Sequence, residues 1–457
     1  MKDNQTIFAL ASGHGVCGVA IIRISGPASF KALNSFGGSE NPTPRTAVMV
    51  ALKHPTTNEL LDQGIVLPFR APASFTGEDV VELHVHGGRA VIDGVLEALA
   101  SVSDCRPAEA GEFTRRAFEN GKLDLTSAEG LGDLLMADTS MQRDQALRQM
   151  DGGLRAIYEG WRSSLVGFLA HLEADIDFPD EDMPEGISGQ VLPQIQELKS
   201  DIAAHLADNK RGQRLRDGFR VVILGAPNVG KSTLLNALAK SDVAIVSDEA
   251  GTTRDSIEVQ LDLGGYPVRL IDTAGIRDGA GAVEAEGIRR SLRRADEADL
   301  KLVLVSAEDA AISKETRELV GDDTMIVVTK GDLVGGHNDE EGVLKAFSES
   351  TSLNSADVHI VSVKSGEGMD AFMGFLGARV AGSLGVREAP ALTRIRHRQS
   401  LEQTVEHLER FQANAGIDPV LAAEDARMAA RALGAITGRV DVEDILDVVF
   451  SDFCIGK

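Results

Sequence analysis

The periodicity of hydrophobic residues changes along the chain, and each periodicity predicts a different kind of domain. Within residues 1–120, the short β-rich runs VAIIRISG, QGIVLPF and DVVELHVHGG alternate with glycine turns, and the helical pattern VIDGVLEALA follows. From Leu154 to Ile176, apolar residues recur every three or four positions, which predicts one face of a long amphipathic helix. A second stripe runs from Ile195 to Leu206. These patterns predict a compact α+β domain followed by a helical domain.

The hydrophobic periodicity changes again at Phe219. The strand-like runs FRVVILG, YPVRLID, LKLVLVS, MIVVTK and HIVSV alternate with helical stretches, which predicts a parallel sheet in an α/β domain. Helical periodicity then returns after about residue 380 and continues through VEDILDVVF. The simplest interpretation is one helical domain in two segments, with the α/β domain inserted between them. The predicted boundaries are 1–120, 121–217, 218–380 and 381–457.

Composition narrows the class of protein. The chain has 457 residues, of which 43% are hydrophobic and 25% charged, as in ordinary globular proteins. It has no apolar run of the roughly 20 residues that span a bilayer, and MKDNQTIFALASGHG predicts a first strand and a turn rather than a signal peptide. Cys17, Cys105 and Cys454 lie far apart without CxxC spacing, which argues against a disulfide framework or zinc site. We therefore expect a cytoplasmic protein.

The formal net charge of −24 argues against a protein that binds nucleic acid without a partner. Affinity for nucleic acid depends mainly on the neutralisation of phosphates by basic residues. Any contact with RNA must be local or shared with a partner. RGQRLRDGFR and TRIRHRQS are the local basic candidates, and each is equally compatible with an ordinary charged helix face.

GAPNVGKS, from Gly225 to Ser232, is a full match to GxxxxGK[ST] between the strand RVVIL and the helix TLLNALAK. That context is the one a phosphate-binding loop requires. Its glycines let backbone N–H groups turn toward phosphate, and the helix start adds the positive end of its dipole. Lys231 can reach the β- and γ-phosphates, and the Ser232 hydroxyl can bind Mg²⁺. A plain glycine turn is the weaker alternative.

Two further strand ends favour GTP over ATP. DTAG, from Asp272 to Gly275, ends the strand YPVRLI, where a carboxylate can hold the Mg²⁺ shell and a glycine N–H can contact the γ-phosphate. The strand MIVVTKGD ends in a segment that resembles the NKxD motif of GTPases, with Thr329 in place of asparagine. Asp332 would accept hydrogen bonds from guanine N1 and N2, a donor edge that adenine lacks.

Two shorter segments complete this pattern. SVK, from Ser362 to Lys364, follows the next strand, where GTPases carry the SAK loop that caps the base. GTTRD lies between the P-loop and DTAG, as a switch I segment does, and makes Thr253 the candidate second Mg²⁺ ligand. The residue after DTAG is Ile276, where Ras-like enzymes carry a glutamine that orients water. Because an apolar side chain cannot orient water, its activation must come from elsewhere.

The motifs GxPNxGKST, AGTTRD and DTAG, with FCIGK at the end of the chain, resemble the MnmE (TrmE) family of tRNA-modification GTPases. ISGP, TGEDVVELHVHGG, GEFTRRAFENGKLDLTSAEGL and IDFPDED extend the resemblance over essentially the whole chain. Related GTPases such as Era and Der share only the nucleotide motifs, so the flanking segments carry the identification. The resemblance implies a folate-binding N-terminal domain that makes a constitutive homodimer, a discontinuous helical domain, and an inserted α/β P-loop GTPase domain.

The resemblance also implies that GTP hydrolysis accelerates when K⁺ bridges two GTPase domains. Asn228 matches the K⁺-ligating asparagine, and Ser247, Glu249 and Thr252 match the loop that completes the K⁺ site. There K⁺ would supply the positive charge that an arginine finger supplies elsewhere. Glu284 matches the glutamate that orients the attacking water, and one more solvated carboxylate is the alternative.

Motifs and resemblance together predict a full set of nucleotide-site residues. The predicted catalytic residues are Lys231, Glu284 and Cys454, and the predicted Mg²⁺ ligands are Ser232 and Thr253. The predicted GTP-binding residues are Asn228, Val229, Gly230, Lys231, Ser232, Thr233, Ser247, Thr252, Thr253, Asp272, Thr273, Ala274, Gly275, Thr329, Lys330, Asp332, Ser362, Val363 and Lys364.

Carried over by the resemblance, the folate-binding residues are Arg23, Glu82, Lys122 and Lys457. An arginine and a lysine suit the glutamyl carboxylate of folate, and Glu82 suits pterin N–H groups. Taken one at a time, each of these residues is an ordinary surface ion-pair partner. The pairings stay open.

The tail DFCIGK places Cys454 where a prenylation signal would have its cysteine, but the final glycine and lysine do not fit that signal. The resemblance implies instead that the tail reaches the folate site. Whether Cys454 is a nucleophile there or only packs stays open.

Two metal-like patterns have simpler interpretations. Glu82, His84 and His86 alternate on one strand, but no further ligand group at metal spacing accompanies them, which favours a polar strand face. IDFPDED lacks the spaced glycine and final glutamate of an EF-hand loop, which favours a solvated helix end.

The resemblance implies a GTPase that helps to modify the wobble uridine of certain tRNAs at C5. The implied partners are a flavoprotein that uses FAD and NADH, in a heterotetramer or larger complex, and tRNA, with no membrane. The implied cofactors are GTP, Mg²⁺, K⁺ and 5,10-methylene-tetrahydrofolate, with 5-formyl-tetrahydrofolate as an analogue. One alternative is a ribosome-assembly switch of the Era/Der type, but no KH or other basic RNA-binding module accompanies the GTPase motifs. Another is a folate-dependent transferase in which the GTPase domain only regulates.

Overall fold

The computed structural model describes most of the chain in two compact units. The described residues are 5–13, 15–177, 187–207, 210–245, 258–272, 298–308, 320–333, 342, 357–385, 391–415, 417–440, 446, 449–451 and 453–456. Unit 1 comprises residues 1–132, 149–196 and 403–457, and unit 2 comprises 133–148 and 197–402. The three-domain division expected from the sequence stays a prediction. Among the described residues, no helix is long and apolar enough to cross a membrane.

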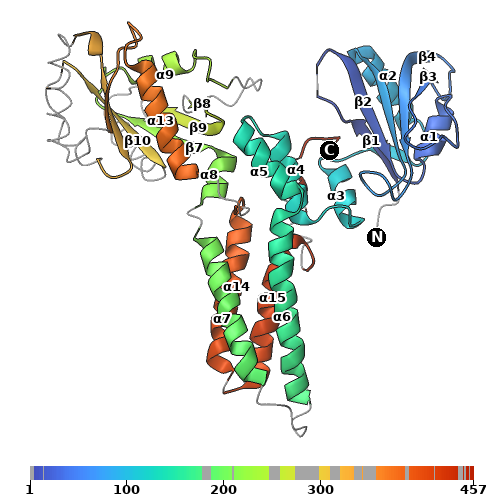
Figure 1. Cartoon of the computed structure of the whole chain (residues 1–457). Helices are drawn as coiled ribbons and strands as arrows, with labels where there is room; N and C mark the ends of the chain where they lie inside the picture. Colours follow the sequence, from blue (N-terminus) through green and yellow to red (C-terminus); the bar gives the residue numbers. More distant parts are fainter. Residues whose placement is uncertain are drawn as a thin grey trace, which may run out of the picture. The chain divides into compact units, whose positions relative to one another are not determined.

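Unit 1 contains a six-stranded sheet, drawn mostly in blue in Figure 1, and its strand order is β3-β4-β5-β2-β1-β6. The strands are β1 (Thr6–Leu10), β2 (Cys17–Ser25), β3 (Val48–Lys53), β4 (Leu60–Phe69), β5 (Val80–Gly87) and β6 (Cys105–Pro107). Helices α1 (Ser29–Ser35) and α2 (Arg89–Ala100) pack on one face, where Phe30, Leu33 and Leu99 join strand residues such as Ile22 in the core. Because side chains alternate along a strand, Arg23 lies on the opposite face from Ile22.

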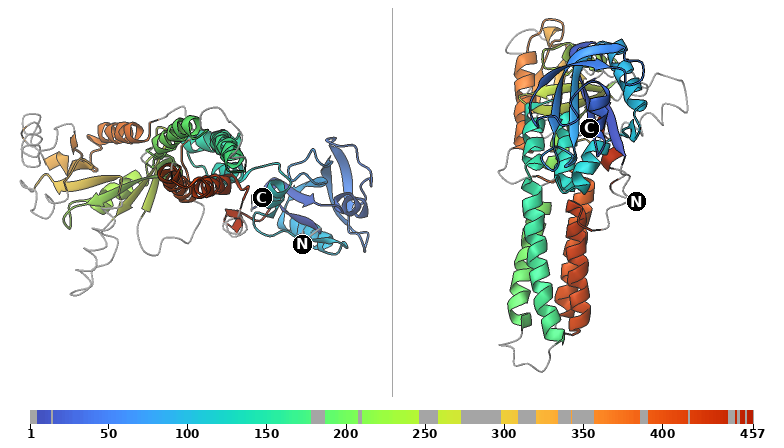
Figure 2. Two further views of the ribbon diagram at one scale, coloured as in Figure 1. Left: turned by 90° about the horizontal axis from the view of Figure 1, so that it is seen from below. Right: turned by 90° about the vertical axis from the view of Figure 1, so that its right-hand side faces the viewer.

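The helices that follow this sheet in the chain begin with α3 (Glu112–Glu119), α4 (Leu125–Leu135) and α5 (Ser140–Met150). The predicted amphipathic stripes form α6 (Gly153–Asp177) and α7 (Ile187–Leu206), and the C-terminal segment forms α14 (Ile395–Asn414) and α15 (Pro419–Thr437). In unit 1, α6 and α15 run side by side, as Figures 1 and 2 show. Asp418 caps α15 by accepting hydrogen bonds from the backbone N–H groups of Val420 and Leu421, each 3.1 Å long.

Unit 2 contains the predicted α/β sheet, in the order β12-β11-β10-β7-β9-β8. Its elements are α8 (Arg211–Asp217), β7 (Phe219–Leu224), α9 (Lys231–Leu238), β8 (Glu258–Leu263), β9 (Tyr266–Asp272), β10 (Leu300–Ser306), β11 (Thr324–Thr329), η1 (Gly331–Leu333), β12 (Val358–Ile360) and α13 (Met369–Leu384). The strands pair in parallel, except for the edge strand β8, which is antiparallel to β9 and was not predicted.

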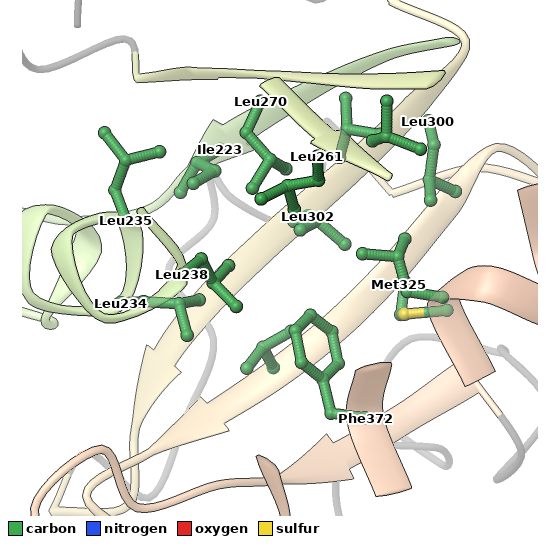
Figure 3. Close-up of a cluster of buried hydrophobic side chains, with 14 of the residues drawn as sticks. Ile223, Leu234, Leu235, Leu238, Leu261, Leu270, Leu300, Leu302, Met325 and Phe372 are labelled. Carbon is green, nitrogen blue, oxygen red and sulfur yellow. The ribbon is translucent and has the colours of Figure 1, made fainter. Parts of the chain in front are cut away.

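One face of this sheet carries an apolar core with α9 and α13 (Figure 3). Leu234 and Leu238 of α9 and Phe372 of α13 meet the strand residues Ile223 and Leu302 there, and all five are buried. A buried parallel sheet needs such covering helices, which explains why its strands are nearly continuous apolar runs. This core supports the carboxyl edge of the sheet, where the predicted nucleotide motifs lie.

The start of α5 belongs to unit 2 and contacts the turn between β8 and β9. The backbone N–H of Met141 donates to the carbonyl oxygen of Gly265 at 3.1 Å, and the side chain of Gln142 donates to the carbonyl of Arg216 at 2.9 Å. The turn residue Gly265 has φ of +92° and approaches Ser140 so closely that a Cβ would collide with it.

The two basic stretches considered for RNA make internal contacts. Arg214 pairs with Asp299 at 2.6 Å, and Arg394 pairs with Asp133 at the same distance. Arg398 donates to the carbonyl oxygen of Leu206 at 2.9 Å. These contacts favour the alternative interpretation of both stretches as charged helix faces.

Candidate functional site

The predicted nucleotide-site residues that the structure describes gather at the carboxyl edge of the sheet in unit 2. The P-loop follows β7, Asp272 ends β9, Thr329 ends β11, and Ser362 follows β12. Because these strands are parallel, their carboxyl ends meet at one edge, which is where open α/β sheets bind ligands. Segments far apart in the sequence are thus brought together.

Lys231 is the central cation of the P-loop. Its ammonium donates to the carbonyl oxygens of Gly225 and Ala226, each at 2.8 Å, and its side chain is largely buried. Burial lowers the pKa of Lys231, and the nearby Asp272 carboxylate opposes that shift. A desolvated cation inside a loop of backbone groups suits the binding of phosphate oxygens.

The P-loop turn depends on backbone conformations that few residues adopt. Gly225 has φ of +145°, and a Cβ there would come within 3.1 Å of the Val229 side chain and 3.3 Å of the Leu304 carbonyl carbon. Asn228 and Gly230 have φ of +64° and +99°. Gly230 is the N-cap of α9, so the loop leads directly into the helix start that the motif requires.

Ser232 and Asp272 form the candidate Mg²⁺ site. The Ser232 hydroxyl donates to a carboxylate oxygen of Asp272 at 3.3 Å, and Asp272 is buried. A hydroxyl and a carboxylate are the hard oxygen donors that Mg²⁺ prefers, so the pair fits this ion. Thr233, the next residue of α9, is exposed.

The candidate base-binding loop joins Asp332 to the segment after β12. The Ser362 hydroxyl donates to Asp332 Oδ1 at 2.8 Å, and Lys364 Nζ lies 3.8 Å from Asp332 Oδ2. The backbone N–H of Gly331 donates to the carbonyl of Val361 at 3.0 Å, which ties the two segments together, and Val363 is half-buried beside them. The carboxylate that would read guanine is therefore held in place by its predicted neighbours.

Glu308 is a neighbour of this site that the sequence did not reveal. Its carboxylate pairs with Lys330 Nζ at 2.5 Å, and the hydrogen bond and charge of Lys330 lower the pKa of Glu308. Its only signal in the sequence is an acidic residue two positions after the end of β10. Lys330 itself has φ of +58°, unusual for a residue with a Cβ.

Several predicted residues lie outside the described part of the chain, and their roles stay predictions. They are Ser247, Glu249, Thr252, Thr253, Thr273, Ala274, Gly275, Ile276, Glu284 and Lys457. Of the four predicted K⁺ ligands, the structure describes Asn228 alone.

The described folate-site candidates lie in unit 1. Arg23 of β2 and Glu82 of β5 are register partners, and their side chains form an ion pair at 3.0 Å. The Arg23 guanidinium lies 5.4 Å from the ring centre of Phe75 and 5.7 Å from that of Phe113. Lys122 Nζ donates to the carbonyl of Pro72 at 3.0 Å, in the same loop as Phe75. Aromatic faces beside the Glu82 carboxylate could hold a flat, polar ring that carries N–H donors, such as a pterin.

Phe75 was missed because a single loop phenylalanine has no periodicity that would mark it. The two histidines beside Glu82 have carboxylate partners within hydrogen-bonding or ion-pairing range. His84 lies 3.6 Å from Glu82, and His86 bonds to Asp62 of β4 at 2.8 Å. No group of three metal ligands occurs among the described residues, and these contacts describe a polar strand face.

A partly buried ionic network supports the loop that carries Phe75. Glu78 accepts from Ser25 at 2.7 Å and from Arg116 at 3.2 Å, and Arg116 also donates to Glu112 at 3.0 Å. Arg106 binds both oxygens of Glu112, at 2.7 and 2.8 Å. Burial alone would raise the pKa of Glu112, but hydrogen bonds from Arg106, the Glu109 backbone and Arg116 outweigh it and lower that pKa.

The C-terminal tail docks beside this network. Ile455 forms an antiparallel bridge with Ala110, and Phe453 is buried in a cluster with Leu125 and Ala128. Gly456 has φ of +102°, and its Cα lies against the Leu10 carbonyl at the end of β1. Cys454 is exposed, as is Cys17, and all three cysteines are free thiols.

A strand, P-loop and helix with a Mg²⁺-type carboxylate and a guanine-type aspartate at one sheet edge define a P-loop GTPase domain. Family comparisons identify the rest of the chain. Residues 6–122 match the family model described as the GTP-binding protein TrmE N-terminus, and residues 125–454 match the MnmE helical domain. The chain belongs to the MnmE (TrmE) family of tRNA modification GTPases, which confirms the resemblance found in its sequence.

Individual relatives match almost the whole of this chain. The tRNA modification GTPase MnmE of Parvibaculum lavamentivorans is 51% identical and is covered completely, over 99% of this chain. The protein of the same name from Paramagnetospirillum magneticum is 50% identical with the same coverage. The mitochondrial 5-taurinomethyluridine-[tRNA] synthase subunit GTPB3 of Danio rerio is 46% identical over 99% of this chain and 93% of its own.

Among solved structures, the G domain of the T. maritima FeoB iron transporter aligns with 36% of this chain and 98% of its own. The two are 22% identical, with a TM-score of 0.26.

Proposed function

We propose that this protein couples Mg²⁺- and K⁺-dependent GTP hydrolysis to a one-carbon modification at C5 of the tRNA wobble uridine. The observation that carries the proposal is the convergence of Lys231, Ser232, Asp272 and Asp332 on one sheet edge, in a chain that belongs to the MnmE family. The Danio rerio relative is named as a subunit of a 5-taurinomethyluridine-[tRNA] synthase, which supports a uridine C5 product and a second subunit.

In the GTPase domain, the residues of this chain bind, orient and neutralise the nucleotide. Lys231 would exchange its two carbonyl partners for phosphate oxygens, and Asp332 would accept from the guanine edge. Mg²⁺, held by Ser232 with Thr253, would offset the phosphate charge. Asn228, Ser247, Glu249 and Thr252 would hold K⁺.

Because Ile276 cannot orient water, that role is assigned to Glu284.

In the N-terminal domain, the paired Arg23 and Glu82 would orient a methylene-tetrahydrofolate, which supplies the one-carbon unit. Phe75 would stack against its ring, and Lys122 and Lys457 would bind its glutamyl carboxylate. The docked tail would bring Cys454 near this site, either as a nucleophile or as a packing residue. A homodimer, a flavoprotein partner with FAD and NADH, and a cytoplasmic location belong to the same proposal.

Steady-state GTP hydrolysis in KCl and in NaCl at equal ionic strength, with ATP as the control substrate, tests the nucleotide half of the proposal. Faster turnover with K⁺ and none with ATP are expected. Glu284→Ala should lower kcat in KCl by about 10²-fold or more while GTP binding persists, as loss of a water-positioning group predicts. Equal rates in both salts would reject the K⁺ mechanism and favour a switch of the Era/Der type.

Calorimetric titration with 5-formyl-tetrahydrofolate tests the folate half. Arg23→Ala should weaken binding by about tenfold or more, because the charged partner that orients Glu82 is lost. Arg89→Ala, at an exposed helix residue, is the matched control. Binding that Arg23→Ala leaves unchanged would move the folate site elsewhere. A separate result would favour a folate-dependent transferase whose GTPase domain only regulates it. That result is a Lys231→Ala variant that still binds folate and still supports tRNA modification.

A further inference from the structure

Thr329, which replaces the asparagine of the NKxD motif, faces the P-loop. Its hydroxyl oxygen lies 2.5 Å from the carbonyl oxygen of Val229 and 3.2 Å from that of Val305, and the residue is only 3% exposed. A threonine hydroxyl has one proton to donate. The short distance assigns that proton to Val229, in the phosphate-binding loop.

The bonded carbonyl lies at the turn of that loop. Val229 stands between Asn228 and Gly230, whose φ angles are +64° and +99°. Glycine adopts a positive φ freely, but at Asn228, which carries a Cβ, this conformation persists because surrounding contacts fix it. The Thr329 side chain supplies one such contact, and its methyl and Cβ also lie within 4 Å of where a Gly230 Cβ would stand.

The base-reading group is separate from Thr329. Asp332, three residues later, accepts from Ser362 at 2.8 Å and retains carboxylate capacity for the guanine N1 and N2 donors. Thr329 has no remaining donor for an acceptor on the base, because its only proton is committed to Val229.

We propose that Thr329 is a positioning residue that ties the phosphate loop to the base-binding strand β11, and that it does not select guanine. Its loss would shorten the residence of any nucleotide equally and leave discrimination between bases to Asp332. This inference rests on the proposed GTP site.

The test is nucleotide exchange in the full-length protein. Release of N-methylanthraniloyl-GDP is measured for wild type, Thr329→Val, Thr329→Ser and Thr329→Ala, with relative affinities for GDP, IDP and XDP. Thr329→Val should release GDP about tenfold faster, since a buried carbonyl loses its donor. Its GDP to IDP and GDP to XDP affinity ratios should stay within about twofold of wild type, because no base contact is lost.

Thr329→Ser keeps the donor and should restore slow release relative to Thr329→Ala, a comparison that stands even if the valine variant fails to fold. Thr324→Val is the matched control, since Thr324 is equally buried on β11 and its hydroxyl accepts from the Gly321 N–H at the far end of the strand. Asp332→Asn should invert the preference between GDP and XDP.

The positioning role of Thr329 would be overturned if Thr329→Val released GDP at the wild-type rate. It would also be overturned if Thr329→Ser released GDP as fast as Thr329→Ala. A base-preference change in Thr329→Val comparable to that of Asp332→Asn would overturn the division of roles. Failure of the wild type to bind GDP at all would instead reject the proposed GTP site, and the inference with it.

Discussion

Gly456 fixes where the C-terminal tail docks, and replacing it by alanine should release the tail. Its φ of +102° costs a residue with a Cβ about 1–3 kcal/mol. In addition, a Cβ would come within 2.9 Å of the Leu10 carbonyl carbon and closer still to its oxygen. Leu10 cannot withdraw easily, because it pairs with Ile22 in the sheet. The tail must therefore move.

The strain alone, about 1–3 kcal/mol, corresponds to about a 5- to 150-fold larger population of undocked tail. Hydrogen exchange followed by mass spectrometry measures this directly, because the Ala110–Ile455 bridge protects backbone amides on both segments. We expect faster exchange in the peptides around Ala110 and at the end of the chain, with no change in β2 or β5. If the proposed folate site includes the tail, affinity for 5-formyl-tetrahydrofolate should fall in parallel.

Gly121→Ala separates strain from crowding. Gly121 has φ of +69°, but no atom lies within 4 Å of where its Cβ would stand. This variant should leave exchange in the tail unchanged. Tail exchange in Gly456→Ala within about twofold of wild type would refute the argument, since even the smallest strain considered predicts about fivefold.

Two further variants probe the ionic network and the P-loop. Glu112→Gln should lower the free energy of unfolding of unit 1 by about 2 kcal/mol at pH 7, because Arg106 and Arg116 lose a charged acceptor. Since the folded pKa of Glu112 lies below its ordinary value of 4.5, that difference should be full above pH 4.5 and disappear as pH falls through the folded pKa. Urea unfolding followed by the fluorescence of the single tryptophan measures it, and a difference that grows in acid would contradict it. Gly225→Ala should weaken GDP binding about tenfold or more by strain and crowding, whereas Gly264→Ala, with φ of +64° and open space around it, should bind normally. Equal affinities in these two variants would contradict the prediction.

The sequence predicted most of the α/β fold because apolar runs and P-loop chemistry are local properties. The edge strand β8 was not predicted because EVQLDL mixes charged and apolar residues, and its pairing with β9 depends on a two-glycine turn. The P-loop could be recognised in eight consecutive residues. Phe75 and Glu308 could not, because their partners Arg23 and Lys330 lie far away in the sequence and meet them only in the folded chain.

The folate-site candidates also lie too far apart in the sequence to be grouped by a local pattern. Arg23, Glu82 and Lys122 span a hundred positions, and only the family resemblance grouped them. The structure pairs Arg23 with Glu82 across neighbouring strands, an arrangement that a one-residue slip in register would have broken.

The contact between α5 and the β8–β9 turn has a practical consequence for dividing the protein into fragments. Unit 2 is built from residues 133–148 and 197–402, so no single stretch of chain contains it. A fragment that spans residues 218–380 would lack Met141 and Arg214. It would therefore lose the contacts of these two residues with Gly265 and Asp299. Only a fragment that contains both 133–148 and 197–402 keeps both contacts, so GTP turnover by this unit should be measured in a chain that retains both stretches.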